Sequence, residues 1–350
     1  MVKEVVIQNR KMGQGHPCFI IAEAGVNHNG DVKMAKKLID AAAHAGADAV
    51  KFQTFRADNV VTSDAPKAQY QIRATGRQES QLEMLKKLEL PLEAFQELQN
   101  YCLQKGILFM STPFDEDCAD FLDEMGMPVF KIPSGELTNA FFVAHVAEKK
   151  KPLIVSTGMA TLEEVDAAVR IILDANNTKF VLLHCVSSYP ADPGDVNLRA
   201  MDALRKFFKV PVGFSDHTRG IEVALAAVAM GACVLEKHFT LCRRMSGPDH
   251  QVSLEPDELM QLVKGIRTVE MAFGNGLKQP CEAEIDTAKV ARRSLVANRD
   301  IAKGSRLALE WVAIKRPGTG LAPAILPRLV GLQVKSDIQA GSFLTLEMFE

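Results

Sequence analysis

The sequence predicts an α/β protein: a (β/α)8 barrel followed by a small C-terminal module. Eight short apolar runs alternate with helical patterns, and this alternation stops after the Gly-Asn-Gly at 274–276. The runs are continuously apolar, which is typical of parallel strands covered on both faces. Eight β-then-α units favour a closed barrel. An open doubly wound sheet is the alternative, but no GxGxxG follows the first run, which weakens its dinucleotide-binding version.

The expected strands are residues 19–23, 47–52, 107–111, 129–132, 153–156, 180–184, 212–214 and 233–238. Helical spacing fills the segments between them. Val32, Leu38 and Ala42 fall on one helical face before Gly46. A later helix begins behind Thr161, which has Glu three residues on, as in a capping box.

Two connections depart from the regular barrel pattern. Residues 53–81 are polar and long for a β-to-α loop, and loops of this length are usually functional. This segment would lie at the C-terminal end of the strands. Residues 1–18 precede the first strand and contain Gly13-Gln14-Gly15, which we expect to form a hairpin turn below the barrel.

The domain organisation expected is a barrel over residues 1–282, a linker over 283–291 and a module of short strands and turns over 292–350. The module holds nine Lys or Arg and five Asp or Glu, a net of +4, so the remainder of the chain carries −6. A segment this short builds only a small core. We therefore expect it to pack on its own barrel or on a partner chain of opposite charge.

Composition excludes several classes of function. The net charge of −2 and pI near 6.5 give no reason to expect nucleic acid or an anionic membrane as partner. No run of 18 apolar residues appears, and the N-terminus lacks a signal-peptide core. The seven cysteines are scattered and never spaced as CxxC, so we interpret them as reduced thiols of a cytoplasmic protein.

Polar side chains gather where the apolar runs end, which is where barrel enzymes place their chemistry. They include two lysines and three hydroxyl residues: Lys51, Lys131, Thr112, Ser134 and Ser156. Fixed cations among hydroxyls suit an anion such as phosphate or carboxylate. The alternative is that each Ser or Thr only caps the next helix.

Two histidines end consecutive strands. His217 follows the seventh run and His238 ends the eighth, and those strands are neighbours in a barrel. Neutral imidazoles on adjacent strands can share one divalent metal, with water and substrate in the other positions. The alternative is two separately hydrogen-bonded histidines. His28 fits a loop or lid residue better, and His184 fits a core histidine.

Six motifs cover nearly the whole chain in order: AEAGVNHNG at 22–30, KIPSGE at 131–136, STGM at 156–159, GFSDHT at 213–218, EKHFT at 236–240 and KRPGTG at 315–320. Together they resemble the motifs of the N-acetylneuraminate (sialic acid) synthase family, which includes legionaminic and pseudaminic acid synthases.

The resemblance implies a barrel joined to an antifreeze-like (SAF) domain. It also implies a domain-swapped homodimer in which that domain covers the partner's active site. The implied reaction joins phosphoenolpyruvate to N-acetylmannosamine, or to a related 2,4-diacetamido-6-deoxy sugar, and releases phosphate. The implied cofactor is a divalent metal, Mn²⁺ or Mg²⁺.

By motif position, His217 and His238 are similar to the metal ligands and Glu23 to the catalytic carboxylate. Ser187 stands where some members carry Asn, which affects the choice of sugar. The residues similar to the phosphoenolpyruvate-binding set are Lys51, Thr112, Lys131, Ser134, Ser156 and Ser215. The residues similar to sugar contacts are Gln53, Tyr189, Asp249 and Arg316, the last from the partner chain.

Two other functions compete with this interpretation. A deoxy-sugar-phosphate synthase uses the same chemistry, but it needs a further basic pocket for a second phosphate. A carbohydrate- or ice-binding protein is suggested only by the C-terminal module. A binding function of this kind does not explain why a carboxylate, two lysines and two histidines stand at strand ends.

Overall fold

A computed structural model describes residues 4–76 and 78–350 of the chain. The chain divides into two compact units after Phe273. In the first unit, eight parallel strands form one sheet in the order β5-β4-β3-β10-β9-β8-β7-β6, and β5 also contacts β6, so the sheet is ring-shaped. The strands are β3 (Phe19–Gly25), β4 (Ala49–Thr54), β5 (Leu108–Pro113), β6 (Phe130–Ile132), β7 (Leu153–Ser156), β8 (Phe180–Cys185), β9 (Val212–Asp216) and β10 (Val234–His238).

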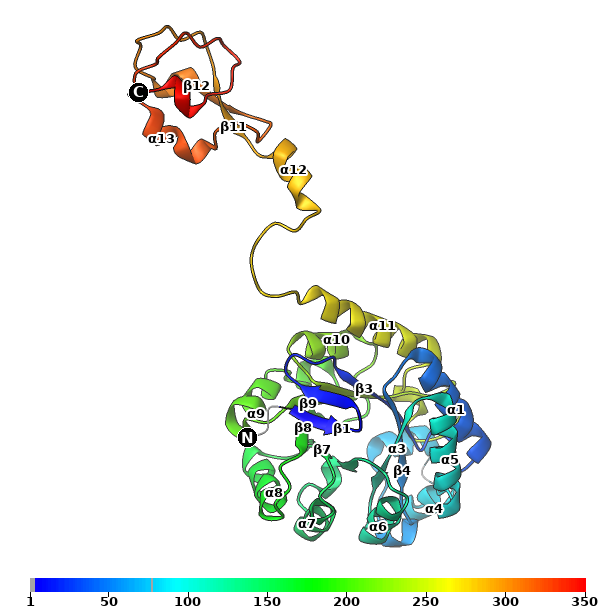
Figure 1. The fold of residues 1–350 in the computed structure, drawn as a ribbon. Coiled ribbons are helices and arrows are strands. Elements are labelled where there is room, and N and C mark those ends of the chain that lie inside the picture. Colours follow the sequence, from blue (N-terminus) through cyan, green and yellow to red (C-terminus); the bar gives the residue numbers. More distant parts are fainter. Residues whose placement is uncertain (1–3, 77) are drawn as a thin grey trace. The chain divides into compact units, whose positions relative to one another are not determined.

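Helices surround this ring of strands (Figure 1). They are α1 (Val32–Ala45), α5 (Leu92–Lys105), α6 (Glu116–Glu124), α7 (Ala140–Glu148), α8 (Leu162–Asp174), α9 (Ala200–Phe208), α10 (Glu222–Ala229) and α11 (Pro256–Ala272). The predicted capping box is present, because Thr161 accepts a hydrogen bond from the Glu164 amide and Glu164 accepts one from the Thr161 amide. Helix α1 ends before Gly46, as predicted, and Gly46 adopts the left-handed conformation. The (β/α)8 fold class is confirmed.

Alternation along the strands separates two hydrophobic cores. In β10, for example, Leu235 packs outward against the helices and Val234 packs into the barrel interior. Because strand side chains alternate between faces, Glu236 and His238 share the inward face with Val234. The same alternation directs the polar side chains at the ends of the other strands toward the axis of the barrel.

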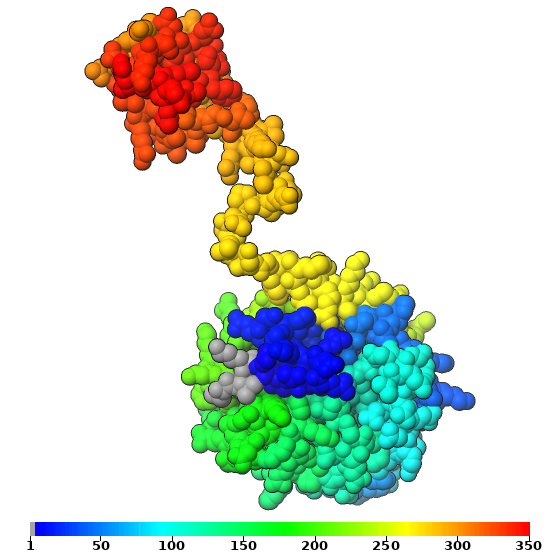
Figure 2. Space-filling model, viewed as in Figure 1, coloured from blue at the N-terminus to red at the C-terminus, as the bar shows by residue number. Residues whose placement is uncertain are grey.

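An N-terminal hairpin closes one end of the barrel. Strands β1 (Glu4–Ile7) and β2 (Arg10–Gly13) pair antiparallel, and Val5, Ile7 and Met12 pack on the interior side chains of the barrel. In Figure 2 this blue hairpin lies over the end of the barrel that faces the viewer. The predicted hairpin turn at Gly13–Gly15 is wrong. The turn is at Gln8-Asn9, since Ile7 pairs with Arg10 and Gln8 adopts a left-handed φ of 51°.

The long polar connection after β4 contains three short helices. They are α2 (Ala57–Val60), α3 (Gln69–Thr75) and α4 (Gln81–Lys86). A separate small apolar cluster holds this segment to the barrel, in which Met84 and Leu88 pack on Val26 and Phe55.

The C-terminal unit has its own hydrophobic core of ten buried apolar side chains. Its elements are α12 (Glu284–Ala291), β11 (Ser294–Ala297), β12 (Val312–Lys315) and α13 (Leu326–Leu329). Helix α12 lies in the range expected for the linker, and the Lys289 carbonyl accepts a hydrogen bond from the Gly318 amide at 2.7 Å.

Five of the seven cysteines of the chain are buried. In the described chain no helix is long and apolar enough to cross a membrane.

Candidate active site

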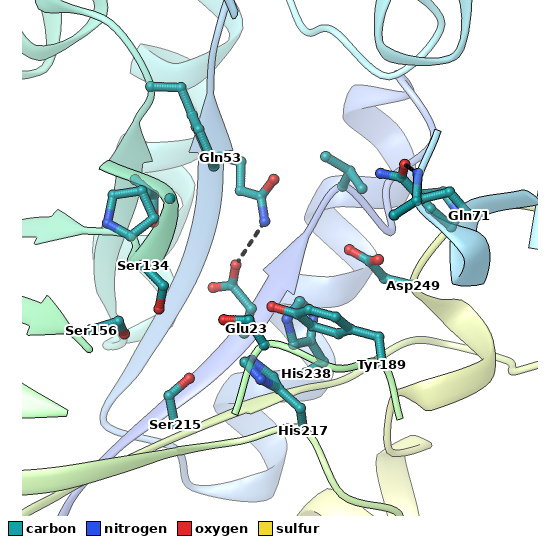
Figure 3. Close-up of a pocket in the computed structure, with 18 of the residues that line it drawn as sticks. Glu23, Gln53, Gln71, Ser134, Ser156, Tyr189, Ser215, His217, His238 and Asp249 are labelled. Atoms are coloured by element: carbon teal, nitrogen blue, oxygen red, sulfur yellow. Dashed lines mark hydrogen bonds between the residues drawn. The ribbon is translucent and has the colours of Figure 1, made fainter. Parts of the chain in front are cut away.

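A cavity of about 400 Å³ opens at the C-terminal ends of the barrel strands (Figure 3). The site residues that the sequence predicts in the barrel all line it: Glu23, Lys51, Gln53, Thr112, Lys131, Ser134, Ser156, Ser187, Tyr189, Ser215, His217, His238 and Asp249. Arg316, the remaining predicted residue, follows β12 in the C-terminal unit. The barrel residues of this set come together in one cavity because the parallel strands of a barrel all end at the same rim.

Charges of both signs are buried together at the floor of the cavity. Lys51 lies 2.7 Å from a carboxylate oxygen of Glu23 and 3.4 Å from Glu236, and its ammonium group donates to the Thr112 hydroxyl at 2.8 Å. Lys131 lies 3.4 Å from the other oxygen of Glu236, which also accepts from Ser215 at 2.8 Å. Such a network keeps two cations desolvated and fixed in place.

The two carboxyl groups at this floor differ in proton affinity. Burial raises the pKa of Glu23 to about 7, although the nearby Lys51 charge opposes the shift. Burial would also raise the pKa of Glu236, but Lys131 and Lys51 outweigh it and lower that pKa to about 2. A pair of carboxyls with separated pKa values provides one permanent anion and one group that titrates near neutrality.

Hydroxyl groups line one side of the cavity, and helix capping does not account for them. Ser134 accepts from the Gly158 amide at 3.0 Å, Thr112 accepts from Lys51, and Ser156 has a buried hydroxyl with no hydrogen-bond partner. A Cβ at Gly158 would collide with the Ser134 and Ser187 hydroxyls, so glycine is required for this close approach. An unpartnered buried hydroxyl indicates a place for a bound polar group.

The two predicted histidines face each other across neighbouring strands. Their ring centroids are 5.6 Å apart, and Nδ1 of His217 donates to the Val186 carbonyl at 2.7 Å. Nδ1 of His238 is buried without a hydrogen-bond partner. Burial lowers the pKa of both imidazoles, so both are neutral near pH 7. In the described residues no three His, Cys, Asp or Glu side chains cluster as metal ligands.

An aromatic stack supports the histidine pair. The ring of Tyr189 lies 4.2 Å from His217 and 4.9 Å from Tyr70 of α3. Burial raises the pKa of Asp249 to about 6, and this carboxyl lines the cavity beside the stack. His28 and His184, the other two histidines considered from the sequence, do not line the cavity. His28 is buried in a loop against Phe52, which excludes an exposed lid residue, and His184 points outward and contacts the Val196 carbonyl.

Sequence reasoning gave no role to several residues that line the cavity, among them Glu236, Tyr70 and Gln71. Glu236 was visible at a strand end but received no role, although it shares the inward face with His238 two residues away. Tyr70 and Gln71 come from α3, inside the long connection. The length and polarity of that connection were the signal, but no periodicity in it identified which side chains face the cavity.

Comparison with known proteins identifies the family. The NeuB family model matches residues 38–278, and the SAF domain model matches residues 292–350. The N,N'-diacetyllegionaminic acid synthase of Legionella pneumophila is 47% identical over 97% of this chain and 96% of its own length. The Campylobacter jejuni enzyme of the same name is 50% identical over 87% of this chain and 92% of its own length.

The chain belongs to the NeuB family. A crystal structure of the N-acetylneuraminic acid synthetase of Leptospira borgpetersenii in complex with citrate agrees with the fold, with a TM-score of 0.72 at 36% identity. It covers 82% of this chain and 95% of that one. NeuB proteins are phosphoenolpyruvate-dependent condensing enzymes, so the protein is an enzyme of that type. The non-catalytic carbohydrate-binding alternative is thereby excluded.

Proposed function

We propose that this NeuB enzyme condenses phosphoenolpyruvate with an open-chain acylated amino sugar and water, giving a nine-carbon sugar acid and phosphate. The supporting observation is one cavity that combines two fixed cations and several hydroxyls with Glu23 and two neutral imidazoles. The relatives at 47% and 50% identity are N,N'-diacetyllegionaminic acid synthases, which favours a 2,4-diacetamido-6-deoxy sugar as acceptor. N-Acetylmannosamine is the second candidate, and a pseudaminate-type acceptor is the third.

The anionic groups of phosphoenolpyruvate fit the side of the cavity that carries the hydroxyls. Lys131 and Lys51 supply the charge, while Ser134, Ser156 and Thr112 supply hydrogen bonds. Ser215 also belongs to the proposed phosphoenolpyruvate-binding residues, because its hydroxyl donates a hydrogen bond to Glu236. Fixing phosphate and carboxylate holds the enol carbon in one orientation, which lowers the entropic part of the barrier.

The acceptor fits beside this anion site. Gln53, Tyr189, Asp249 and Ser187 line that part of the cavity and offer hydrogen bonds to hydroxyls and amides. Gln53 also donates to Glu23 at 3.3 Å, which connects the acceptor site to the acid group.

The proposed condensation forms one carbon–carbon bond and breaks one carbon–oxygen bond. The enol carbon of phosphoenolpyruvate attacks the aldehyde carbon, whose oxygen takes up a proton. Water adds to the oxocarbenium-like carbon that carries the phosphate and loses a proton to Glu23 in its carboxylate form. The carbon–oxygen bond then breaks as the new hydroxyl becomes the ketone carbonyl, and phosphate leaves with the bridging oxygen and takes up the hydroxyl proton.

His217 and His238 are the residues that would hold the divalent metal, Mn²⁺ or Mg²⁺. The fit rests on neutral imidazoles on neighbouring strands and on the unpartnered, buried Nδ1 of His238. When bound there, the metal supplies Lewis-acid stabilisation of the aldehyde oxygen.

A phosphate-release assay tests this function. Wild-type enzyme with phosphoenolpyruvate should release phosphate only when an acylated amino sugar is present. Phosphoenolpyruvate labelled with ¹⁸O at the bridging position should yield labelled phosphate. EDTA should abolish turnover and Mn²⁺ or Mg²⁺ should restore it, whereas His217→Ala should fold normally and bind Mn²⁺ weakly by titration. Unlabelled phosphate would contradict carbon–oxygen cleavage, and full activity without metal would contradict the metal site.

A further inference from the structure

The motif at the end of the first barrel strand has polar residues that the cavity does not use. This motif, AEAGVNHNG, supplies Glu23 to the cavity, but Asn27 and Asn29 do not line it. Their side chains instead form hydrogen bonds with residues 239–255, the connection between β10 and α11. Because this connection contributes Asp249 to the cavity, contacts made outside the cavity can act on its shape.

The ring of His250 is the centre of one set of these contacts. It is completely buried, with Nδ1 2.6 Å from the Thr240 hydroxyl and Nε2 3.2 Å from the side-chain oxygen of Asn29. The side-chain nitrogen of Asn29 donates to the Ser246 carbonyl at 2.9 Å. Because an amide oxygen can only accept, Nε2 of His250 carries the proton and Nδ1 accepts from Thr240. One neutral tautomer thus joins β10, the loop after β3 and the connection.

The connection approaches this ring closely at Gly247. A Cβ at this position would lie 2.7 Å from Cδ2 of His250 and 2.9 Å from the side-chain oxygen of Asn29. Such distances are too short for any side chain, so only glycine lets the backbone pass while the ring and the amide stay in place. The contact between the connection and the loop after β3 is therefore closely packed as well as hydrogen-bonded.

A second set of contacts holds the backbone of Asp249 itself. The Ser253 hydroxyl donates to the Asp249 carbonyl at 2.7 Å and accepts from the side-chain amide of Asn27 at 2.9 Å. Asn27 is buried and also donates to the Phe239 carbonyl at 2.8 Å. The Asp249 side chain forms no capping hydrogen bond with the short helical turn that follows it. The direction of its carboxyl group therefore depends on how the backbone is held.

We infer that Asn27, Asn29 and His250 are positioning residues that hold the Asp249 carboxyl at the acceptor end of the cavity. Asp249 lies on the side of Glu23 opposite the hydroxyl groups (Figure 3). The inference rests on the proposed function, which has the acceptor bind at that end. A carboxyl group that is already fixed in the free enzyme loses less conformational freedom when the acceptor binds, which strengthens binding.

Two substitutions of His250 separate its two hydrogen bonds. His250→Gln can place an amide nitrogen near the position of Nε2 and keep the bond to Asn29. His250→Asn can place an oxygen near the position of Nδ1 and keeps only the bond to Thr240. We expect the acceptor KM to rise about tenfold in His250→Asn and only about threefold in His250→Gln, which retains the link to the loop. The KM for phosphoenolpyruvate should stay at the wild-type value in both variants.

A pair of isosteric asparagine variants separates positioning from general stability. Asn29→Asp replaces the donor to the Ser246 carbonyl by an oxygen and should raise the acceptor KM about tenfold. Asn177→Asp is the matched control. Asn177 is also buried and donates to the Lys151 carbonyl at 2.9 Å, but it precedes β8 at the opposite end of the barrel. Both variants should unfold at lower urea concentration, whereas only Asn29→Asp should change the acceptor KM.

Amide hydrogen exchange of the substrate-free enzyme gives a readout besides activity. Peptides from residues 239–255 should exchange faster in His250→Asn and Asn29→Asp than in the wild type. The same peptides should keep the wild-type rate in Asn177→Asp. Wild-type exchange in both of the first two variants would show that these side chains do not hold the connection, and the inference would be wrong.

The failure of the inference and the failure of the proposed function are distinguishable. If no acylated amino sugar supports phosphate release by the wild-type enzyme, the proposed function is wrong. If the wild type releases phosphate but folded His250→Asn and Asn29→Asp keep its acceptor KM, the inference alone is wrong. An equal rise in the KM of both substrates would also overturn it, because that result marks a general structural effect. Should the His250 variants not fold, the isosteric Asn29→Asp decides.

Discussion

Glu23 is in an unusual position for a carboxyl group: it is fully buried, it has a lysine at 2.7 Å, and it still has a raised pKa of about 7. The permanent charge of the neighbouring Glu236 contributes to that shift. A group that titrates near neutrality can exchange protons with water in both directions at physiological pH. This proton affinity is the reason for which we propose Glu23 as the group that takes the proton of the attacking water.

We predict that the pH profile of kcat/KM reports this group. Glu23 is protonated below about pH 7, and a protonated carboxyl cannot accept a proton, so activity should fall as pH decreases through 7. Glu23→Gln should lower kcat/KM by about 100-fold or more and abolish this inflection. An unchanged inflection in the Gln variant would assign it to another group.

Lys131 should act on phosphoenolpyruvate binding. Lys131→Met keeps the length of the side chain and removes the charge, and Glu236 keeps Lys51 and Ser215 as partners. We expect the KM for phosphoenolpyruvate to rise about 10- to 100-fold, the value of a charge-assisted hydrogen bond, with the circular-dichroism spectrum unchanged. A wild-type KM for phosphoenolpyruvate would remove Lys131 from the anion site.

Strands β9 and β10 carry a second buried ion pair, on the faces that point away from the cavity. Lys237 donates to Asp216 at 2.6 Å and to the Thr218 carbonyl at 2.7 Å, and both charged side chains are almost inaccessible to water. Each member of the pair immediately precedes one of the two cavity histidines. The pair therefore joins the strand ends from which His217 and His238 project, and we predict that it positions these two histidines.

Breaking that pair should affect both stability and metal binding. Lys237→Met leaves the Asp216 charge buried alone and should lower the free energy of unfolding in urea by about 3–5 kcal/mol. Mn²⁺ affinity, measured by calorimetric titration of the folded variant, should fall with it. Arg170→Met is the control, because it breaks the exposed pair with Asp166 and should cost less than about 1 kcal/mol. Unchanged Mn²⁺ affinity in Lys237→Met would leave the pair a purely structural role.

The whole molecule consists of two units that each have a core, and Arg316 lies in the one without the cavity. Residues 292–350 carry +4 and the rest of the chain −6, which favours association of the SAF domain with a barrel. We propose a domain-swapped homodimer in which Arg316 of the partner subunit contacts the acyl group of the sugar. A guanidinium can hold an amide oxygen in a directed way that an ammonium cannot.

Mixing two inactive variants tests the swap. His217→Ala and Arg316→Ala, unfolded and refolded together, form heterodimers in which one site takes intact His217 from one chain and intact Arg316 from the other. Random pairing should restore about one quarter of wild-type activity. If confirmed heterodimers stay as inactive as each parent, each SAF domain covers its own barrel.

The sequence was sufficient for the features that local pattern controls. Buried parallel strands require continuous apolar runs, so all eight strands were located within a few residues of their ends. Because parallel barrel strands all end at one rim, the polar residues after those runs could be assigned to a common site. Turn chemistry was less decisive: Gly13 and Gly15 looked like the hairpin turn, but pairing of Val5 and Ile7 with the second strand placed it at Gln8-Asn9.

Tertiary structure alone decided which charges interact and how. Lys51 and Lys131 are 80 residues apart in sequence, yet Glu236 bridges them from a third strand, and burial together with that network sets the pKa values of both carboxyls. The apolar side chains that the long connection contributes to the cavity, Val60, Met84, Leu85 and Leu88, were equally inaccessible to sequence reasoning, because short helices with no sustained period gave no indication of which side chains face the cavity. Periodicity reports the face of an element, whereas proton affinity and shape depend on distances between elements, and only packing determines those distances.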